Sequence, residues 1–151
     1  MILSIDHTSF TVSNIKRTIA FYRDVLGMRV FWDSVEAGVP YKGPIADKIT
    51  GCPGTEQHLV FVAIGNSKLE FVEYTPTGKP LVDNKASDTG SAHVCFHTDN
   101  IMELYHKLVA SGARIHCDPQ TSGPRKVMYF RDPDGIILEA MEGPPRVEER
   151  R

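Results

Sequence analysis

The sequence contains no long hydrophobic run and no extended run of basic residues. A membrane-spanning helix needs about 20 consecutive apolar residues, so we expect no membrane contact. No run of consecutive Lys or Arg is longer than two, as in Arg150-Arg151, and the formal net charge is −2, which is atypical of a nucleic-acid-binding protein. Asp6 and His7 interrupt the N-terminal stretch that would have to be apolar in a signal peptide. These absences predict a cytoplasmic protein that binds neither membrane nor nucleic acid.

Cysteine is also scarce. The three cysteines, Cys52, Cys95 and Cys117, are odd in number and form no CxxC motif. A chain of 151 residues with 41% hydrophobic residues buries a core large enough to need no disulfide bonds. We therefore expect one domain with reduced thiols in a reducing compartment.

An internal repeat organises the sequence. Residues 6–15 align with residues 92–101 when the chain is shifted by 86 positions, and His, Phe, Asn and Ile coincide. Further on, Leu-Glu-Phe-Val-Glu at 69–73 aligns with Leu-Glu-Ala-Met-Glu at 138–142. Such self-similarity indicates duplicated structural units. The single domain, residues 1–145, is divided into a first module (1–76), a linker (77–90) and a second module (91–145), and a charged tail (146–151) follows.

Each module is predicted to have the element order βαβββ. Residues alternate in the opening segments as in strands, and helices begin after Asn14 and Asn100, whose side chains suit helix N-caps. The segment 33–57 contains four Gly and three Pro, which is typical of a long lid or binding loop. The predicted strands are 3–11, 29–34, 58–64 and 68–74 in the first module, and 93–97, 113–117, 127–131 and 136–141 in the second.

Two residue pairs occupy equivalent positions in the modules: His7 with Glu70, and His93 with Glu139. Each His lies on an opening strand, and each Glu follows a hairpin turn by four residues, among apolar neighbours. A buried, unpaired carboxylate costs several kcal/mol, so two such Glu residues indicate a cation. If the halves pack with pseudo-twofold symmetry, the four side chains converge on one divalent ion, and Ni, Co, Zn, Mn or Fe(II) would suit these donors. For a single His on an apolar strand, the alternative is a core residue without a ligand role.

Neighbouring positions predict a substrate pocket. Arg125 and Lys126 either reach an anionic group of a substrate or belong to a solvated loop. A metal triad of His93, Cys95 and His97 is disfavoured, because strand residues four apart lie about 13 Å from each other. Strand alternation places the following residues on the faces that carry the ligands: Ser9, Thr11, Val72, Tyr74, His97 and Met141.

These motifs resemble the vicinal oxygen chelate superfamily, which contains glyoxalases, bleomycin resistance proteins and extradiol dioxygenases. The sequence is most similar to the lactoylglutathione lyase and methylmalonyl-CoA epimerase types. The resemblance implies an α+β fold in which two tandem βαβββ modules form a cupped, eight-stranded, barrel-like sheet with helices outside. It spans residues 5–145 and depends on Asp6-His7, the segment 20–27 (Ala-Phe-Tyr-Arg-Asp-Val-Leu-Gly), Ser91-Ala92-His93, and the segment 130–139 with Phe-Arg-Asp-Pro-Asp-Gly and Leu-Glu.

By the same resemblance, one divalent metal ion is bound by His7, Glu70, His93 and Glu139, and the chain forms a homodimer. The implied reaction removes a proton next to a metal-chelated carbonyl of a small substrate that has two vicinal oxygens. Lyase, isomerase and epimerase outcomes differ only in where the proton returns. Glu139 is the first candidate for the base, and Glu70 is the second.

Two other functions within the superfamily remain open. An extradiol-type dioxygenase binds its metal through two His and one carboxylate, and the additional carboxylate of Glu70 disfavours that function. A non-catalytic binding or resistance protein has no need for four filled ligand positions. Thr11 and Tyr74 stand where the lyases have the Arg and Asn that hold glutathione, so the substrate class stays open.

Overall fold

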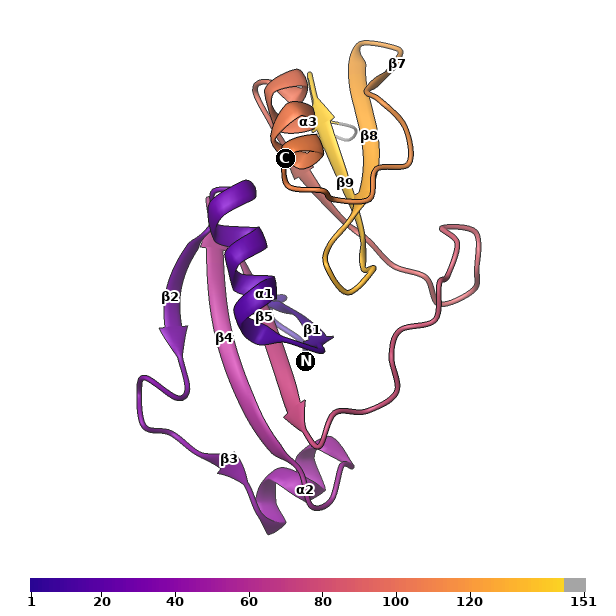
Figure 1. The fold of residues 1–151 in the computed structure, drawn as a ribbon. Coiled ribbons are helices and arrows are strands. Elements are labelled where there is room, and N and C mark those ends of the chain that lie inside the picture. Colours follow the sequence, from indigo (N-terminus) through magenta and orange to yellow (C-terminus); the bar gives the residue numbers. More distant parts are fainter. Residues whose placement is uncertain (146–151) are drawn as a thin grey trace. The chain divides into compact units, whose positions relative to one another are not determined.

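The computed structural model describes residues 1–145, and the predicted charged tail, residues 146–151, lies outside the described residues. The chain divides into two compact units, residues 1–80 and a second unit that begins at Leu81. Each unit has its own sheet, as Figure 1 shows. Of the helices in residues 1–145, none is long and apolar enough to cross a membrane.

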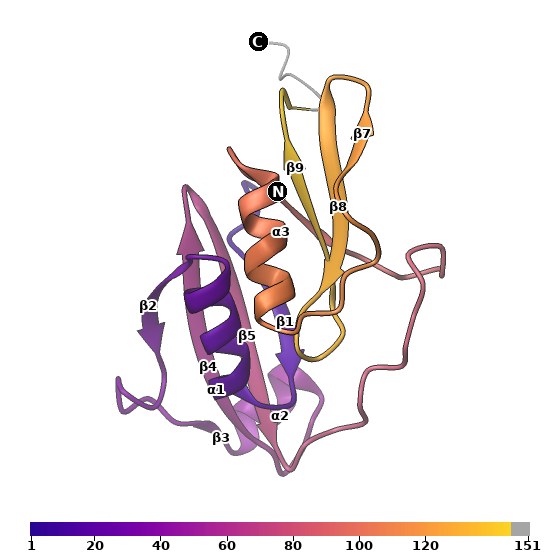
Figure 2. The same cartoon turned by 45° about the horizontal axis from the view of Figure 1, so that its top comes forward.

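The first unit is a five-stranded sheet with a helix on one face. The strand order is β1-β5-β4-β2, β3 pairs with β4, and β1 runs parallel to β5. Figure 2 shows α1 lying against this sheet. The buried ring of Tyr22 packs on Phe71 of β5 with 4.4 Å between ring centroids, so the helix buries its apolar face there. The elements are β1 (Thr8–Val12), α1 (Ile15–Ala20), the π-helical turn η1 (Phe21–Val25), β2 (Arg29–Asp33), β3 (Tyr41–Lys42), α2 (Pro44–Thr50), β4 (Glu56–Ile64) and β5 (Ser67–Thr75).

The second unit repeats this connectivity in a four-stranded sheet. The strand order is β6-β9-β8-β7, and β6 runs parallel to β9 as β1 does to β5. Ile101 and Leu108 of α3 are fully buried. The elements are β6 (Val94–His97), α3 (Ile101–Ala110), β7 (Gln120–Ser122), β8 (Arg125–Arg131) and β9 (Ile137–Glu142). The predicted α+β class is confirmed, and the second unit has the predicted βαβββ order, which the first unit also has with β3 and α2 inserted between β2 and β4.

The two helices begin in the same way. The side chains of Asn14 and Asn100 each accept a hydrogen bond from the backbone N–H three residues later, as predicted for N-caps. In addition, Glu73 of β5 accepts the first N–H of α1 at 2.7 Å, and Glu142 of β9 accepts the first N–H of α3 at 2.8 Å. A carboxylate at a helix N-terminus is stabilised by the helix dipole, so each sheet fixes the start of its own helix.

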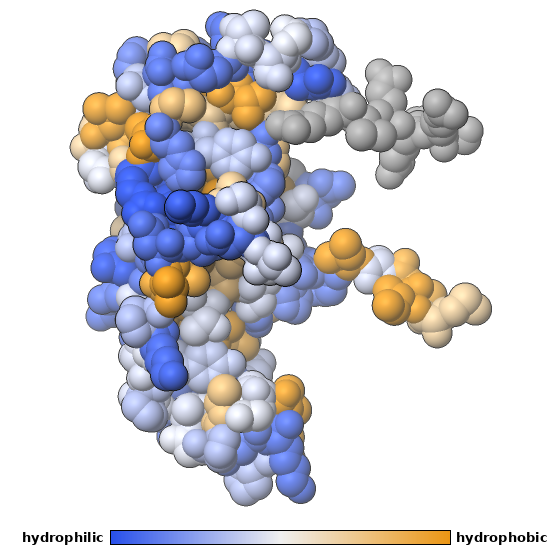
Figure 3. Space-filling view, turned by 90° about the vertical axis from the view of Figure 1, so that its right-hand side faces the viewer, coloured by the Kyte–Doolittle hydropathy of each residue, from blue (hydrophilic) through white to orange (hydrophobic). Residues whose placement is uncertain are grey.

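Two strands begin later than predicted. β1 and β6 start at residues 8 and 94, so His7 and His93 lie immediately before their strands rather than within them. In the β1–β5 register Asp6 falls beside Ser67, the first residue of β5, and residues 1–5 therefore have no partner strand. On the face drawn in Figure 3, hydrophobic residues form small separate groups on a mostly hydrophilic surface. The exposed hydrophobic residues at the N-terminus are Met1, Ile2, Leu3 and Ile5.

The predicted strand 113–117 is wrong. Ile115 makes a single bridge to Phe130, and the edge strand β7 forms only at residues 120–122. Pro119 separates the two paired stretches, and a proline has no N–H to give to the ladder.

The segment 33–57, predicted to be a loop, contains β3 and α2. Gly43 and Gly51 flank the helix with positive φ angles of 87° and 69°, and Pro44 stands at its first position. Proline suits this position because its fixed φ is helical and the N–H it lacks has no intrahelical partner there. The residues that indicated a loop are thus the two ends of a short helix.

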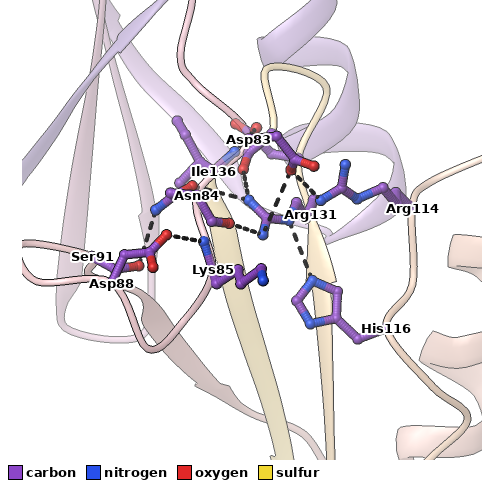
Figure 4. A network of polar contacts seen from close by, with 11 residues as sticks. Asp83, Asn84, Lys85, Asp88, Ser91, Arg114, His116, Arg131 and Ile136 are labelled. Atoms are coloured by element: carbon purple, nitrogen blue, oxygen red, sulfur yellow. Dashed lines mark hydrogen bonds and ion pairs between the residues drawn. The ribbon is translucent and has the colours of Figure 1, made fainter.

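Arg131 fixes the segment after Leu81 to the second unit's sheet, as Figure 4 shows. Its guanidinium is 4% exposed and donates to Asn84 Oδ1 at 3.1 Å, to the Asn84 carbonyl, to the Gly135 carbonyl at 2.7 Å and to His116 Nε2 at 3.3 Å. A carboxylate oxygen of Asp83 lies 4.0 Å away. A buried cation is tolerated only when its donors are satisfied, so these contacts hold residues 83–84 beside β8.

Candidate functional site

The first unit places His7 beside Glu70, which is one of the two pairs that the repeat singles out. His7 Nε2 lies 3.5 Å from Glu70 Oε2, and the side chains are 33% and 12% exposed. Glu70 stands in the middle of β5 and His7 immediately before β1, which is parallel to β5. The geometry depends on the strand pairing, because the register sets Ser9 beside Glu70 and His7 two residues earlier.

Asp6 orients the ring of His7. Asp6 Oδ1 lies 2.9 Å from His7 Nδ1, and Lys68 Nζ binds both carboxylate oxygens of Asp6 at 3.0 and 2.9 Å. Hydrogen bonds from His7 and then from Lys68 hold the pKa of Asp6 below its ordinary value. If Nδ1–H donates to Asp6, the neutral ring has its lone pair on Nε2, which faces Glu70. Metal-ligating histidines typically have such a carboxylate partner on the other ring nitrogen.

The second unit places His93 beside Glu139. His93 Nε2 lies 3.0 Å from Glu139 Oε2, and the Glu139 side chain is only 3% exposed against 37% for His93. The hydroxyl of Tyr129 lies 3.4 Å from the same ring nitrogen. The same two donor types therefore meet at equivalent positions in both units.

An aromatic residue supports each histidine, and the sequence analysis did not find either one. Phe61 contacts the His7 ring edge-to-face at 5.3 Å, and Tyr129 contacts the His93 ring at 5.1 Å. Each aromatic residue lies directly opposite the pair's glutamate, since Phe61 pairs with Glu70 and Tyr129 with Glu139. The two-residue turn between β4 and β5 fixes this register, so counting back from the turn could have located Phe61.

The second glutamate of each repeated segment has a different role. Glu73 and Glu142 lie three residues beyond Glu70 and Glu139, on the opposite sheet face, where they accept the first N–H of α1 and α3. Residues three apart in a strand point to opposite faces. One carboxylate of each repeat thus lies beside a histidine, while the other fixes a helix.

The predicted pocket residues of the first unit share the face of Glu70. The register pairs Ser9 with Glu70 and Thr11 with Val72, and Tyr74 is two residues further along β5. Burial, and then the charges of Cys52 and Glu70, raise the pKa of Tyr74.

Gln57 of β4 lies opposite Tyr74 and was missed by the sequence analysis. Within the described part of the chain, its Nε2 is a buried donor without a hydrogen-bond partner, and the residue is 7% exposed. A polar residue two positions before the apolar run that begins at Leu59 was the available signal. A buried amide donor of this kind costs free energy unless another group binds it.

The predicted pocket residues of the second unit are brought together only in part. His97 and Met141 are strand partners on the face of Glu139, and the His97 ring contacts the Gly143 carbonyl. Arg125 instead donates to the carbonyls of Pro144 and Pro145, at 2.7 Å each. Lys126 pairs with Glu142 on the opposite face. Arg125 is thus engaged by backbone carbonyls, and Lys126 lies on the face opposite to Glu139.

The described residues 1–145 hold no group of three or more His, Cys, Asp or Glu side chains that is placed to hold a metal ion. Each unit by itself supplies one imidazole nitrogen and one carboxylate. Two ligands are fewer than the three or four that a zinc ion takes from a protein site, so neither pair alone makes such a site.

The chain is similar to known enzymes in sequence. Lactoylglutathione lyase of Escherichia coli O157:H7 is 27% identical over 138 residues, which cover 90% of this chain and 90% of the lyase. Mitochondrial methylmalonyl-CoA epimerase of Mus musculus is 26% identical over 143 residues, which cover 89% of this chain and 70% of the epimerase.

The fold is shared with solved structures and with a family. A glyoxalase family protein from Bacillus cereus matches 96% of this chain and 97% of its own with a TM-score of 0.82, at 20% identity. A fosfomycin resistance protein from Listeria monocytogenes, solved with Mn(II), matches 95% of this chain and 93% of its own with a TM-score of 0.65, at 18% identity. The family model for the Glyoxalase/Bleomycin resistance protein/Dioxygenase superfamily matches residues 4–140. Because this match spans most of the sequence, the chain belongs to the Glyoxalase/Bleomycin resistance protein/Dioxygenase superfamily.

Proposed function

We propose that the protein is a metal-dependent lyase or isomerase that removes and returns a proton next to a carbonyl of a small substrate with two vicinal oxygens. One observation carries the proposal: both units hold a histidine Nε2 next to a largely buried glutamate oxygen, at equivalent positions. The similarity to a lyase and to an epimerase supports proton transfer as the shared chemistry.

The donors of the two pairs fit a divalent metal ion. Two imidazole nitrogens and two carboxylate oxygens suit Ni, Co, Zn, Mn and Fe(II), which are ions of intermediate softness. Asp6 holds His7 in the orientation that a ligand needs. We propose that His7, Glu70, His93 and Glu139 bind one such ion, and the Mn(II) in the Listeria structure supports a metal in this fold.

The protein's own residues would carry the proton. A divalent ion held by these four residues would act as a Lewis acid on a coordinated carbonyl and make the neighbouring C–H acidic. Glu139 accepts the proton on a carboxylate oxygen, and its 3% exposure means that the surrounding protein holds this oxygen in place. Returning the proton to the other face of the same carbon gives an epimer, and returning it to the neighbouring carbon gives an isomer or a lyase product. Ser9 and Thr11, on the face of Glu70, provide hydroxyl groups that orient the substrate.

The chain offers matched controls for the metal. Elemental analysis of untagged protein is expected to give about one divalent ion per chain. Glu70→Ala and Glu139→Ala should lose the ion, whereas Glu73→Ala and Glu142→Ala should keep it, since the latter two side chains cap helices. Equal retention by all four variants would contradict the ligand assignment.

A second measurement separates metal binding from catalysis. Glu139→Gln keeps an oxygen donor but has no carboxylate to take a proton, so it should retain metal and lose activity. The assay is NMR detection of solvent deuterium entering the carbon next to a carbonyl, with methylmalonyl-CoA and S-lactoylglutathione as first substrates. Deuterium incorporation at the wild-type rate would exclude Glu139 as the base. A protein that takes up no Ni, Co, Zn, Mn or Fe(II) would instead be a binding protein.

Following the family resemblance, we also propose that the protein is a homodimer. Light scattering should then give about twice the chain mass of 16.8 kDa. A mass equal to that of one chain at micromolar concentration would refute the dimer.

A further inference from the structure

An aromatic pocket lies on the first unit beside His7 and Glu70. Its volume is about 360 Å³, within the range of small-molecule sites. All of its lining comes from one unit, namely Asp6, Phe31, Trp32, Tyr41, Phe61 and Lys68.

The rings of this pocket are set at different angles. Trp32 is 5.8 Å from Phe61 with 67° between the ring planes, and 6.2 Å from Tyr41 with 86° between them. Phe31, the extra residue of the β2 bulge, is 5.9 Å from Phe61. The walls therefore offer ring faces and ring edges together. A flat guest can stack on one ring and receive the edge of the next, which are the two favoured aromatic geometries.

The charged residues of the pocket neutralise each other. Lys68 Nζ binds both oxygens of Asp6, at 3.0 and 2.9 Å, so this ion pair adds no net charge. The remaining lining is aromatic and disfavours an anionic group, and the Arg29 guanidinium already lies 5.6 Å from the centre of the Phe31 ring, which disfavours a second cation there.

Two lining residues connect the pocket to the candidate ligand pair. Phe61 contacts the His7 ring at 5.3 Å and is the strand partner of Glu70. Asp6 lines the pocket and is also bonded to His7 Nδ1. A group bound in the pocket is therefore one side chain away from both donors.

We propose that this pocket binds an aromatic ring of the substrate, so that the substrate is a 2-hydroxy or 2-oxo compound with a single-ring aromatic substituent next to its vicinal oxygens. The vicinal oxygens in this assignment rest on the proposed function, whereas the binding of the aromatic ring does not. A cavity of about 150 Å³ holds one benzene molecule, so the volume here accommodates a ring and the carbons that connect it to the oxygens.

Trp32 is the only tryptophan of the chain and lies in the pocket wall, so it reports occupancy directly. The first titration uses metal-free protein with benzyl alcohol and cyclohexylmethanol, which have the same number of carbons and no vicinal oxygens. Tryptophan emission and the indole N–H signal in NMR spectra measure binding. We expect benzyl alcohol to bind saturably and about tenfold more tightly, because two aromatic contacts replace purely aliphatic ones.

Two variants locate the effect. Phe31→Leu removes one ring but keeps an apolar side chain at a position that is already 41% exposed, so folding should be retained. It should lose most of the preference for the ring, whereas Tyr105→Leu, which removes an aromatic residue of the second unit, should keep it. Equal affinity for the two alcohols, or an unchanged preference in Phe31→Leu, would overturn the assignment.

A second titration separates this inference from the proposed function. Mandelate and lactate share a 2-hydroxycarboxylate, and only mandelate carries a ring. If Mn²⁺ strengthens the binding of both anions while mandelate binds no better than lactate, the metal proposal holds and the pocket assignment fails. If benzyl alcohol binds with ring preference but Mn²⁺ strengthens neither anion, the pocket assignment holds and the proposed function fails.

Discussion

Replacing Arg131 by Met tests how the second unit is held together. The substitution keeps the apolar stem and removes a guanidinium that is 4% exposed. The Asn84 and Gly135 carbonyls, Asn84 Oδ1 and His116 Nε2 each lose a donor (Figure 4). Asn84 and Gly135 are partly buried, so part of the desolvation of their oxygens becomes uncompensated, whereas His116 is exposed to water.

The expected loss follows from this geometry. A hydrogen bond from a charged donor contributes about 1.5–3 kcal/mol, and such contributions within one network do not add fully. The acceptors left behind are neutral and Asp83 is 74% exposed, so no buried charge stays unpaired, and we expect a loss of about 2–4 kcal/mol for Arg131→Met. For a chain of this length that corresponds to a fall in Tm of roughly 4–16 °C. Arg114→Met is the control, because Arg114 pairs with Asp83 at 2.6 Å but both side chains are more than half exposed, and such pairs contribute about 0–1 kcal/mol.

Urea unfolding followed by far-UV circular dichroism measures the loss. Trp32 belongs to the first unit, so its fluorescence serves as a reference for effects confined to the second. Hydrogen exchange gives the local readout, because the Ser91 amide, bonded to the Asp88 carbonyl at 2.9 Å, should exchange faster in Arg131→Met. An unfolding free energy within about 1 kcal/mol of the wild type would show that water satisfies the freed acceptors and would refute the reasoning.

Three further predictions concern single side chains. Gln57→Leu should raise the unfolding free energy by about 1–2 kcal/mol, because it removes the buried donor that has no partner among residues 1–145. Trp32 fluorescence in urea measures this change, and a lower stability would mean that the amide is satisfied. Burial, and then the charges of Arg131 and Arg114, lower the pKa of His116 from 6.5 in the folded protein. The unfolded state therefore binds more protons, and the unfolding free energy should fall as the pH drops below about 6.5. His116→Gln should flatten that fall, and an unchanged pH profile in this variant would contradict the prediction. Asn100→Ala should lower the unfolding free energy by about 1 kcal/mol through the lost cap of α3, and Asn100→Ser should restore most of it.

The parts of the fold that were predictable depend on local signals. The helix caps at Asn14 and Asn100 and the hairpin between the strands predicted at 58–64 and 68–74 each require only a few adjacent residues, and the structure has all three, with β5 beginning one residue earlier than predicted. The start of β1 was mispredicted because it depends on where its partner β5 begins, some sixty residues away.

Other features depend on contacts that residue types do not encode. The short helix α2 was missed because Ile45 and Ile49 are its only large apolar residues at helical spacing, and one such pair between Gly43 and Gly51 does not distinguish a helix from a loop. Both isoleucines are exposed, at 77% and 79%, so the helix is not held by a buried apolar face. The sequence left two roles open for Arg125, a contact with a substrate anion or a place in a solvated loop. In the structure its guanidinium donates to the carbonyls of Pro144 and Pro145. The His–Glu pairs were found within each unit because the duplication marks equivalent positions twice.

The duplicated pairs differ in ways that divide the proposed work between the units. Opposite Glu70 stands Phe61, whose ring is part of the aromatic pocket, so the first unit's pair adjoins a surface suited to binding. Opposite Glu139 stands Tyr129, whose hydroxyl lies 3.4 Å from His93, and Glu139 is 3% exposed against 12% for Glu70. A general base must be held in a fixed position beside the substrate carbon, and a buried side chain is held more firmly than an exposed one. Burial and the adjacent hydroxyl therefore favour Glu139 as the base, with Glu70 as a ligand next to the pocket. Deuterium exchange should then be lost in Glu139→Gln and only reduced in Glu70→Gln, and the reverse order would assign the base to the first unit.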